Sequence, residues 1–451
     1  MNSDFLNKVR NLRIVSRLGW VSGLCLLSGP SFASVPCGDW HTAASPNPET
    51  VNRALHITGR NSNDLWLLGS AGPAYPGTAM IWQRQDTAWV TIPLPDTSPL
   101  GTLPSFNAIA QLANGDKLLG GDARTSYPVY NQPFVALWSG AEWAEVMPIT
   151  LRPQDVYPYG PRGGLIADLV ALDSNDIWAF GYAASMGSGG GVPMAVHFDG
   201  SGWTEFETPI VSNRTNEIIA ADASGSNDIW AVGVQRDIGG AYVPYTMHWG
   251  GEMWTYHAVP NGLSGSLDAV TVISPTDAWA IGASMLIHWD GNSWQSMSLP
   301  TGASSAAIEA VAADDLWVAH MTGGYFHWDG VSWIYAPSPF TPPSGRFTQI
   351  RDFVQFGPCD IWAAGSVLAL DGSAPSTTIV ERLMDSTTPG DLNCDLIVNN
   401  FDIDPFVLAL TDPDAYMTSY PNCDILAADV NADGVVNNFD IDPFVGLLAG
   451  E

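Results

Sequence analysis

The stretch that decides the fold runs from Ser226 to Trp254 and is SNDIWAVGVQRDIGGAYVPYTMHWGGEMW. Its opening phrase returns as SNDLWLLG from Ser62, SNDIWAFG from Ser174, PTDAWAIG from Pro275, ADDLWVAH from Ala313 and GPCDIWAAG from Gly357, with a weaker copy, NGDKLLGG, from Asn114. The shared Asp falls at positions 64, 116, 176, 228, 277, 315 and 360, at intervals of 52, 60, 52, 49, 38 and 45 residues. Seven units of this period indicate a repeat architecture.

The second half of each unit predicts a hairpin. HWGGEMW from His248 has counterparts in HFDGSGW from His197, HWDGNSW from His288, HWDGVSW from His327 and LWSGAEW from Leu137. A Gly-containing pair between alternating apolar residues is a strong hairpin signal. Each unit therefore predicts four short strands, and seven such units predict an all-β, seven-bladed β-propeller. An open solenoid of seven units is the alternative.

The last unit lacks a Trp-led fourth strand, whereas CGDWHTAASP, from Cys37, matches that strand in outline. We therefore expect the N-terminal strand with Trp40 to complete the seventh blade. Cys37 and Cys359 would then share a blade, and a bridge between them would lock the ring. In period and layout, residues 34–385 resemble the kelch and galactose-oxidase-like propellers.

Residues that recur from blade to blade favour a structural role. The recurring His197, His248, His288 and His327 are expected to hold blades together, and the repeated Asp residues to cap backbone N–H groups in turns. The long, non-repeating loops share one face and carry a predicted ligand rim of Tyr75, Tyr127, Tyr130, Tyr157, Tyr159, Tyr242 and Tyr245. Rigid amphipathic rings suit a glycan or protein ligand. Alternatively, the Tyr-Pro pairs only stiffen the loops.

The N-terminus and the charge limit the setting of the protein. Residues 1–33 have the layout of a secretory signal peptide: a basic leader, a short apolar stretch and small residues before Ser34. No later stretch is apolar for long enough to span a membrane. Export permits disulfides between Cys37, Cys359, Cys394 and Cys423, with three pairings open. A net charge of −30 argues against nucleic acid as a partner.

Residues 386–451 contain one acidic phrase twice, GDLNCDLIVNNFDIDPF from Gly390 and ADVNADGVVNNFDIDPF from Ala428. Each places oxygen ligands at the spacing of a twelve-residue calcium loop. The predicted ligands are Asp391, Asn393, Asp395, Ile397 (carbonyl), Asn399 and Asp402 in the first copy, and Asp429, Asn431, Asp433, Val435 (carbonyl), Asn437 and Asp440 in the second. Gly434 occupies the sharp turn of the second loop, whereas the first has Leu396. Asp404 and Asp442 are expected to cap a following helix that begins at Pro405 or Pro443.

Two such loop–helix copies closely resemble a type I dockerin of a cysteine-bearing subgroup. The resemblance implies two calcium ions, docking to a cohesin-like receptor and pairing of Cys394 with Cys423. The positions that cohesins recognise in dockerins hold Asn400, Phe401, Asn438 and Phe439 here, instead of the usual Ser/Thr pair. A standard cohesin is therefore not assured as the partner.

These patterns predict a secreted, extracellular propeller, either free or attached to a cell surface, that a calcium-dependent dockerin tethers and that binds a glycan or protein on its Tyr-rich face. The first alternative is a glycoside hydrolase or lyase delivered by the same dockerin. Glu205, Glu207, Glu217 and Glu309 are its candidate carboxylates, because such hydrolysis needs two of them. The second alternative is a purely structural surface protein without small-ligand affinity.

Overall fold

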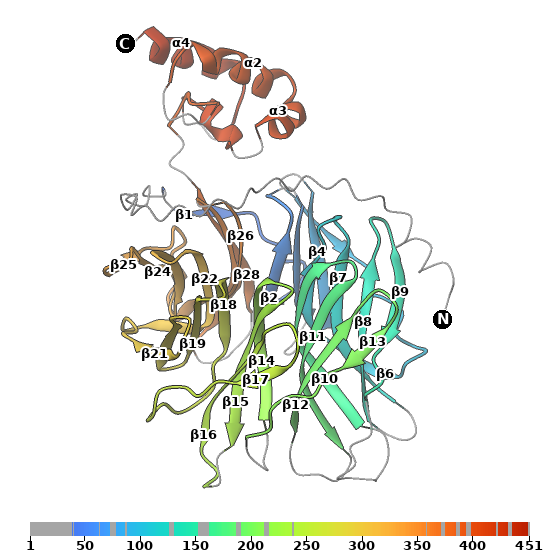
Figure 1. Ribbon diagram of the computed structural model, residues 1–451. Coiled ribbons are helices and arrows are strands. Elements are labelled where there is room, and N and C mark those ends of the chain that lie inside the picture. The colour runs from blue at the N-terminus through green and yellow to red at the C-terminus, as the bar shows by residue number, and fades with distance from the viewer. Residues whose placement is uncertain are drawn as a thin grey trace, which may run out of the picture.

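The computed structural model places four-stranded sheets around a central axis, with the C-terminal helices over one face of the ring (Figure 1). It describes residues 38, 40–62, 64–72, 78–85, 88–125, 130–151, 162–185, 191–211, 216–236, 239–357, 359–370, 375–384, 388–393, 398–420, 423–431 and 435–449. The predicted signal peptide lies outside these residues.

Seven four-stranded antiparallel sheets form the ring, so the predicted seven-bladed propeller is confirmed. The first three blades consist of β2 (Val51–Gly59), β3 (Leu65–Gly72), β4 (Thr78–Gln85) and β5 (Ala88–Ile92); of β6 (Thr102–Gln111), β7 (Lys117–Arg124), β8 (Asn131–Trp138) and β9 (Trp143–Pro148); and of β10 (Arg162–Asp173), β11 (Asp176–Ser185), β12 (Val192–Phe198) and β13 (Trp203–Glu205). The next three consist of β14 (Asn216–Gly225), β15 (Asp228–Arg236), β16 (Tyr242–Trp249) and β17 (Trp254–Tyr256); of β18 (Ala269–Ser274), β19 (Asp277–Gly282), β20 (Met285–Trp289) and β21 (Trp294–Met297); and of β22 (Ala303–Ala312), β23 (Asp315–His320), β24 (Tyr325–Trp328) and β25 (Trp333–Ala336).

The seventh blade joins the two ends of the propeller. β26 (Arg346–Gly357), β27 (Asp360–Ala369) and β28 (Thr377–Met384) receive β1 (Trp40–Ala43) as their outer strand, with Trp40 opposite Leu383. The predicted N-terminal strand exchange is therefore confirmed. Trp40 stacks on Tyr325 of the sixth blade, with ring centroids 3.6 Å apart, so the closing strand also seals a seam between blades.

The repeated Asp and His residues form pairs in the third to sixth blades. In the fourth blade His248 lies opposite Trp230 with ring centroids 4.6 Å apart, and its Nε2 is 2.6 Å from Asp228 Oδ1. The same pair recurs as His197–Asp176, His288–Asp277 and His327–Asp315, each at 2.8 Å. The prediction that these Asp side chains cap backbone N–H groups was therefore wrong, because each lies at the start of a strand and faces the His of the next strand. Asp199, Asp290 and Asp329 of the hairpins cap backbone N–H groups instead.

The C-terminal region is helical and has its own core. It contains η1 (Asn400–Asp402), α2 (Ile403–Thr411), α3 (Pro413–Ser419), η2 (Ile425–Ala428), η3 (Asn438–Asp440) and α4 (Ile441–Ala449). Phe406 of α2 stacks on Phe444 of α4, with ring centroids 4.0 Å apart. The helices begin before the predicted Pro405 and Pro443, because a 3-10 turn capped by Asn399 or Asn437 precedes each of them. Across the described residues, we find no helix of a length and hydropathy suited to crossing a bilayer.

Candidate functional site

The two repeated loops have matching hydrogen bonds around one buried carboxylate each. In the first loop Asp402 Oδ1 accepts from the N–H groups of Leu392 and Asn393 at 2.8 and 3.0 Å, and Oδ2 accepts from Asn399 at 2.9 Å. In the second loop Asp440 accepts from Asn431 at 3.1 Å and from Asn437 at 2.9 Å. Both aspartates are fully buried. Asp402 and Asp440, the twelfth residues of loops that begin at Asp391 and Asp429, therefore link the two ends of their loops.

Asn399 and Asn437, the ninth residues of the two loops, cap the 3-10 turns η1 and η3 that follow them. Asn399 Oδ1 accepts from Phe401 N–H at 2.7 Å, and Asn437 Oδ1 accepts from Phe439 N–H at 2.8 Å. Asn437 Nδ2 also donates to the carbonyl of Val435 at 2.8 Å, which joins two predicted ligands. An amide or carbonyl oxygen has two acceptor positions, so one hydrogen bond does not by itself exclude a cation from such an atom.

The donor chemistry of the loops fits calcium, although the ligand geometry is only partly within the described residues. Asp391, Asn393, Asp429 and Asn431 lie there, whereas Asp395, Ile397 and Asp433 do not. All predicted ligands offer oxygen, which a hard divalent cation prefers. No group of three or more His, Cys, Asp or Glu side chains with metal-holding geometry occurs within the described ranges.

Apolar side chains are exposed at equivalent positions of the two copies. Phe401 and Phe439 are 72% and 71% exposed, Ile403 and Ile441 are both 41% exposed, and Val407 and Val445 are 50% and 55% exposed. We refer to these six side chains as the paired face, and the predicted docking positions Asn400 and Asn438 immediately precede its phenylalanines. Asp404 and Asp442 are exposed on the same helices.

The predicted tyrosine rim is only partly described. Tyr75, Tyr127, Tyr157 and Tyr159 lie outside the described residues. Tyr130 is half-buried, and Tyr242 is exposed with Arg236 over its ring, 4.9 Å from the centroid. Tyr245 is fully buried and its hydroxyl donates to the carbonyl of Pro209, so placing it on an exposed rim was wrong. The side chains of β16 alternate, and Tyr245 faces the neighbouring sheet.

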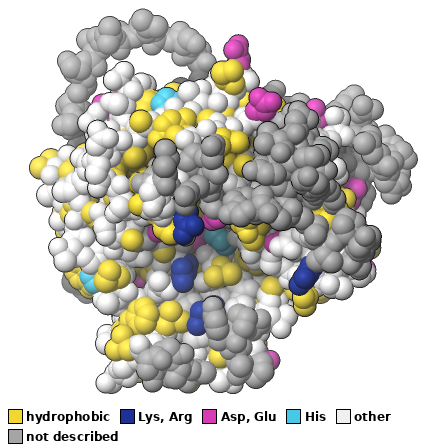
Figure 2. Space-filling view, turned by 90° about the horizontal axis from the view of Figure 1, so that it is seen from below, with side chains coloured by type: hydrophobic (Ala, Val, Ile, Leu, Met, Phe, Trp, Pro, Cys, Tyr) yellow, Lys and Arg dark blue, Asp and Glu magenta, His cyan; other side chains and the backbone are white. Residues whose placement is uncertain are grey.

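The first strands of the seven blades contact one another in sequence and close a ring around the axis. Carboxylates on these strands bond to the next blade: Asp168 to Ala221 N–H at 2.9 Å, Asp222 to Val272 N–H at 2.7 Å, and Asp352 to Ile57 N–H at 2.9 Å. Asp352 Oδ2 also lies 3.4 Å from His56 Nδ1. In the view along the axis from the side opposite the helices, basic side chains and a histidine surround the middle of the ring (Figure 2).

Enclosure by the blades makes two of these carboxylic acids, Asp168 and Asp222, weak. Burial raises the pKa of Asp168 to about 6 and that of Asp222 to about 7. Burial, with the charges of Asp222 and Asp352, also raises the pKa of Glu309 well above its ordinary value. Burial would lower the pKa of His56, but the hydrogen bond to Asp352 and its charge outweigh it, so this pKa is raised.

The candidate glutamates were predicted without knowledge of this ring. Glu309 and Glu217 lie on first strands of the ring, β22 and β14, whereas Glu205 is buried on β13 and Glu207 is exposed beyond that strand. The structure therefore does not gather the four. Sequence reasoning missed His56, Asp168, Asp222 and Asp352, because their one shared signal was a titratable residue in the first strand of a blade.

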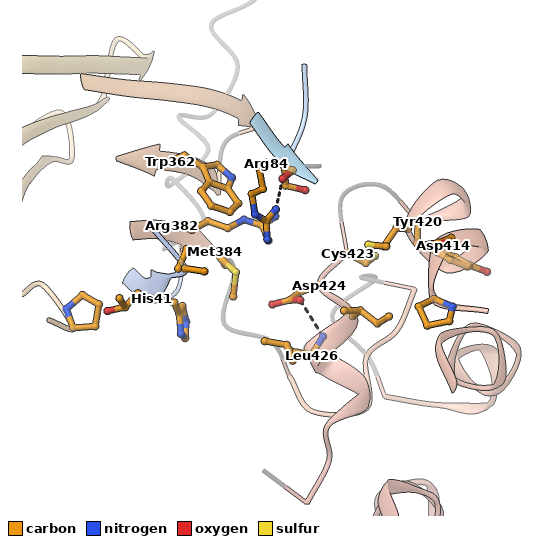
Figure 3. Close-up of a pocket in the computed structure, with 18 residues that line it drawn as sticks. His41, Arg84, Trp362, Arg382, Met384, Asp414, Tyr420, Cys423, Asp424 and Leu426 are labelled. Atoms are coloured by element: carbon orange, nitrogen blue, oxygen red, sulfur yellow. Dashed lines mark hydrogen bonds between the residues drawn. The ribbon is translucent and has the colours of Figure 1, made fainter. Parts of the chain in front are cut away.

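A cleft of about 620 Å³ lies between the seventh blade and the C-terminal helices (Figure 3). On the propeller wall, Arg84 and Arg382 lie 4.8 and 5.2 Å from the centre of the Trp362 ring. The helical wall includes Asp414 and Asp424. Arg84 and Asp424, 340 positions apart in the chain (424 − 84), thus line one site.

Cys359 and Cys423 each take part in a disulfide bond. Cys37 and Cys394 lie outside the described residues, so the predicted pairings stay predictions.

No protein-family model matches the chain, and no curated protein matches it. Among solved structures, it is similar to YCF48 bound to D1 peptide, at 15% identity over 79% of this chain and 100% of the other, with a TM-score of 0.49. YCF48 from Cyanidioschyzon merolae is 16% identical over 77% and 99%, with a TM-score of 0.46. A Dyadobacter fermentans protein of unknown function is 10% identical over 78% and 100%, with a TM-score of 0.43. At these identities the likeness concerns the fold alone.

Proposed function

We propose that this protein is a secreted β-propeller that a dockerin-like module, residues 386–451, attaches to a cohesin-like receptor in a calcium-dependent manner. The observation that carries the proposal is the paired face, in which the same three apolar side chains are exposed in both copies to almost the same extent. Burial of such side chains would stabilise the module, so repeated exposure favours a surface that a partner covers.

Charge limits the kind of partner. Residues 386–451 contain eleven Asp, one Glu and no Lys or Arg. Two such modules would repel each other, whereas a receptor with apolar pockets for Phe401 and Phe439 and a basic rim would complement the face. Calcium in the two loops would neutralise part of this charge and hold each Phe through the Asn cap that precedes it.

Binding of the full chain to a panel of cohesins, measured by isothermal titration calorimetry with calcium and with EDTA, tests the proposal. We expect binding only with calcium, and a loss of about a hundredfold or more in the double variant Phe401→Asp/Phe439→Asp, because central aromatic contacts dominate interfaces. Met253→Asp, an equally exposed position on the propeller (68%), is the matched control. Absence of binding across the panel, or binding indifferent to both EDTA and the double substitution, would refute it.

Export and the two bridges belong to the same proposal. Cleavage before Ser34 would deliver the chain to an oxidising compartment, and the bonds would be Cys37–Cys359 and Cys394–Cys423. The disulfide state of Cys359 and Cys423 supports this. Peptide mapping of the secreted protein without reduction would identify both pairs, and any other pairing would contradict the assignment.

For the propeller itself we propose binding of a glycan or protein on the loop face, and the arginines favour an acidic ligand. Arg124 and Arg236 end β7 and β15, and Arg346 begins β26, which places all three on the side of the second-to-third-strand connections. Tyr242, which with Tyr130 is one of the two described rim residues that are not buried, packs under Arg236. Comparison of the retention of the protein on acidic and on neutral polysaccharides tests this. Tyr242→Ala and Arg236→Gln are expected to weaken retention on the acidic polysaccharides.

A second candidate, glycoside hydrolysis in the channel, is favoured by the raised pKa values of Asp222 and Glu309. A general acid must hold its proton near neutral pH, which an enclosed carboxyl does. Release of new reducing ends from a polysaccharide, abolished by Glu309→Gln with folding retained, would establish it. Retention without release would leave binding as the function.

A further inference from the structure

The seventh blade departs from the repeat at the cleft. In the third to sixth blades the residue opposite the buried Trp is His, whereas Arg382 takes this position opposite Trp362. Arg382 Nε donates to Asp360 Oδ1 at 2.7 Å, as the His residues do to their Asp, but the longer side chain reaches beyond the pair. With Arg84 on the first blade, it makes the propeller wall of the cleft basic (Figure 3).

The opposite wall carries a carboxylate oxygen without a described partner. Asp424 caps η2 through Oδ1, which accepts from Leu426 N–H at 2.9 Å. Its Oδ2 is buried and has no hydrogen-bond partner among the described residues. A buried unsatisfied carboxylate oxygen is costly, so a donor is expected to approach it. Asp414 lies on the same wall.

Between the charged walls the lining is apolar and includes Met384, Met417 and Leu426. Clefts of a few hundred cubic ångströms between two parts of a protein, apolar with a few convergent polar groups, are typical small-ligand sites. A ligand of this cleft must present an anion to the arginines, a cationic donor to Asp424 and an apolar side chain to Met384, Met417 and Leu426.

We propose that the cleft binds a small zwitterion of the α-amino acid class, with its carboxylate toward Arg382 and Arg84 and its ammonium group toward Asp424. The C-terminal helices thereby complete a site that neither part forms alone. This site is independent of the paired face and of the channel.

Calorimetry on the full chain in calcium-containing buffer tests the proposal with three probes of one shape: L-leucine, 4-methylpentanoate, which lacks the amine, and 3-methylbutylamine, which lacks the carboxylate. We expect leucine to bind about tenfold or more tightly than either analogue, because each charged hydrogen bond contributes roughly that factor.

Two variants assign the walls. Arg382→His restores the pair found in the other blades and removes the guanidinium, so leucine should weaken to the level of the amine. Asp424→Asn keeps an oxygen for Leu426 N–H, and leucine should weaken to the level of 4-methylpentanoate. Glu252→Gln, exposed on the fourth blade and away from the cleft, should change nothing. Unfolding curves first confirm that each variant is folded. If one variant does not fold, the other still tests whether its wall of the cleft binds leucine.

Three results would overturn the proposal: no leucine binding at millimolar concentration, equal binding of all three probes, or leucine affinity unaffected by both variants. A loss of stability of the ligand-free protein in Asp424→Asn, without any leucine binding by the native chain, would show that the cleft is only an electrostatic seam.

Discussion

Arg382 and Asp360 join the third and second strands of the last blade through a 2.7 Å contact between Nε and Oδ1. Four other blades use a His in place of the Arg, at 2.6 to 2.8 Å. In the first blade Lys117 of the neighbouring blade reaches Asp64 at 3.0 Å. An acid at the start of the second strand with a cationic or imidazole partner is therefore the recurring polar contact of this propeller.

Asp228→Ala should lower the free energy of unfolding of the propeller by about 2–3 kcal/mol, because His248 and Ser224 would both lose a buried acceptor. Urea unfolding followed by tryptophan fluorescence measures this loss. Asp314→Ala, an exposed aspartate one residue before the equivalent Asp315, is the matched control. Equal effects of the two substitutions would show that the repeated pair does not stabilise the fold.

Trp40→Ala should destabilise the propeller by about 3–5 kcal/mol, since a buried aromatic side chain would be removed from the closing strand. The side chain is 4% exposed and contacts both Tyr325 and Trp317 of the sixth blade. Thermal unfolding is the measurement, and His41→Ala on the same strand, where the side chain is exposed, should change little. A stable, monomeric Trp40→Ala protein with an unchanged transition would contradict closure by this strand.

Asp222→Asn should stabilise the propeller at neutral and alkaline pH. The folded pKa of about 7 lies above the ordinary value, so the folded state binds this proton more tightly and stability decreases as the pH rises between the two values. Asn cannot ionise and still accepts from Val272 N–H, so we expect a gain of about 1–2 kcal/mol at pH ~8 and almost none at pH ~4, after allowance for channel water. Chemical unfolding at both pH values measures the difference, and a gain of equal size at both would exclude ionisation as its cause.

Asp402→Asn should loosen the first loop and its helix. An amide can accept through its oxygen, but its nitrogen would face the Asn399 N–H that Oδ2 now accepts, so we expect a loss of about 1–3 kcal/mol in the helical region. Hydrogen exchange of the α2 amides and the number of calcium ions bound, expected to fall from two to one, are the measurements. Asp404→Asn, exposed in the first turn of α2, serves as the control. If hydrogen exchange of the α2 amides and the number of bound calcium ions do not change, Asp402 does not hold the first loop in place.

The repeat by itself determined the architecture. Within the first six blades each strand pairs with a neighbour in the same unit, and the same phrase written seven times repeats the same local preferences, so blade number and strand number followed from the pattern. The placement of Trp40 in the last blade followed from the strand that the last unit lacks. The alternation rule also placed the long connections on one face. It failed for Tyr245, whose burial depends on a neighbouring sheet that the pattern does not contain.

Only the tertiary structure decided which side chains share an environment. His56 and Asp352 are separated by 296 positions (352 − 56) and meet because the ring closes, while Arg382 and Asp424 line one cleft because the helices lie over the seventh blade. The pKa of Asp222 likewise depends on its enclosure by the blades around it. A sequence encodes contacts along a strand or turn through its period, but burial and charge at a site sum over segments that are distant in the chain. For this reason the repeat predicted the scaffold, and the candidate sites emerged only from the folded ring.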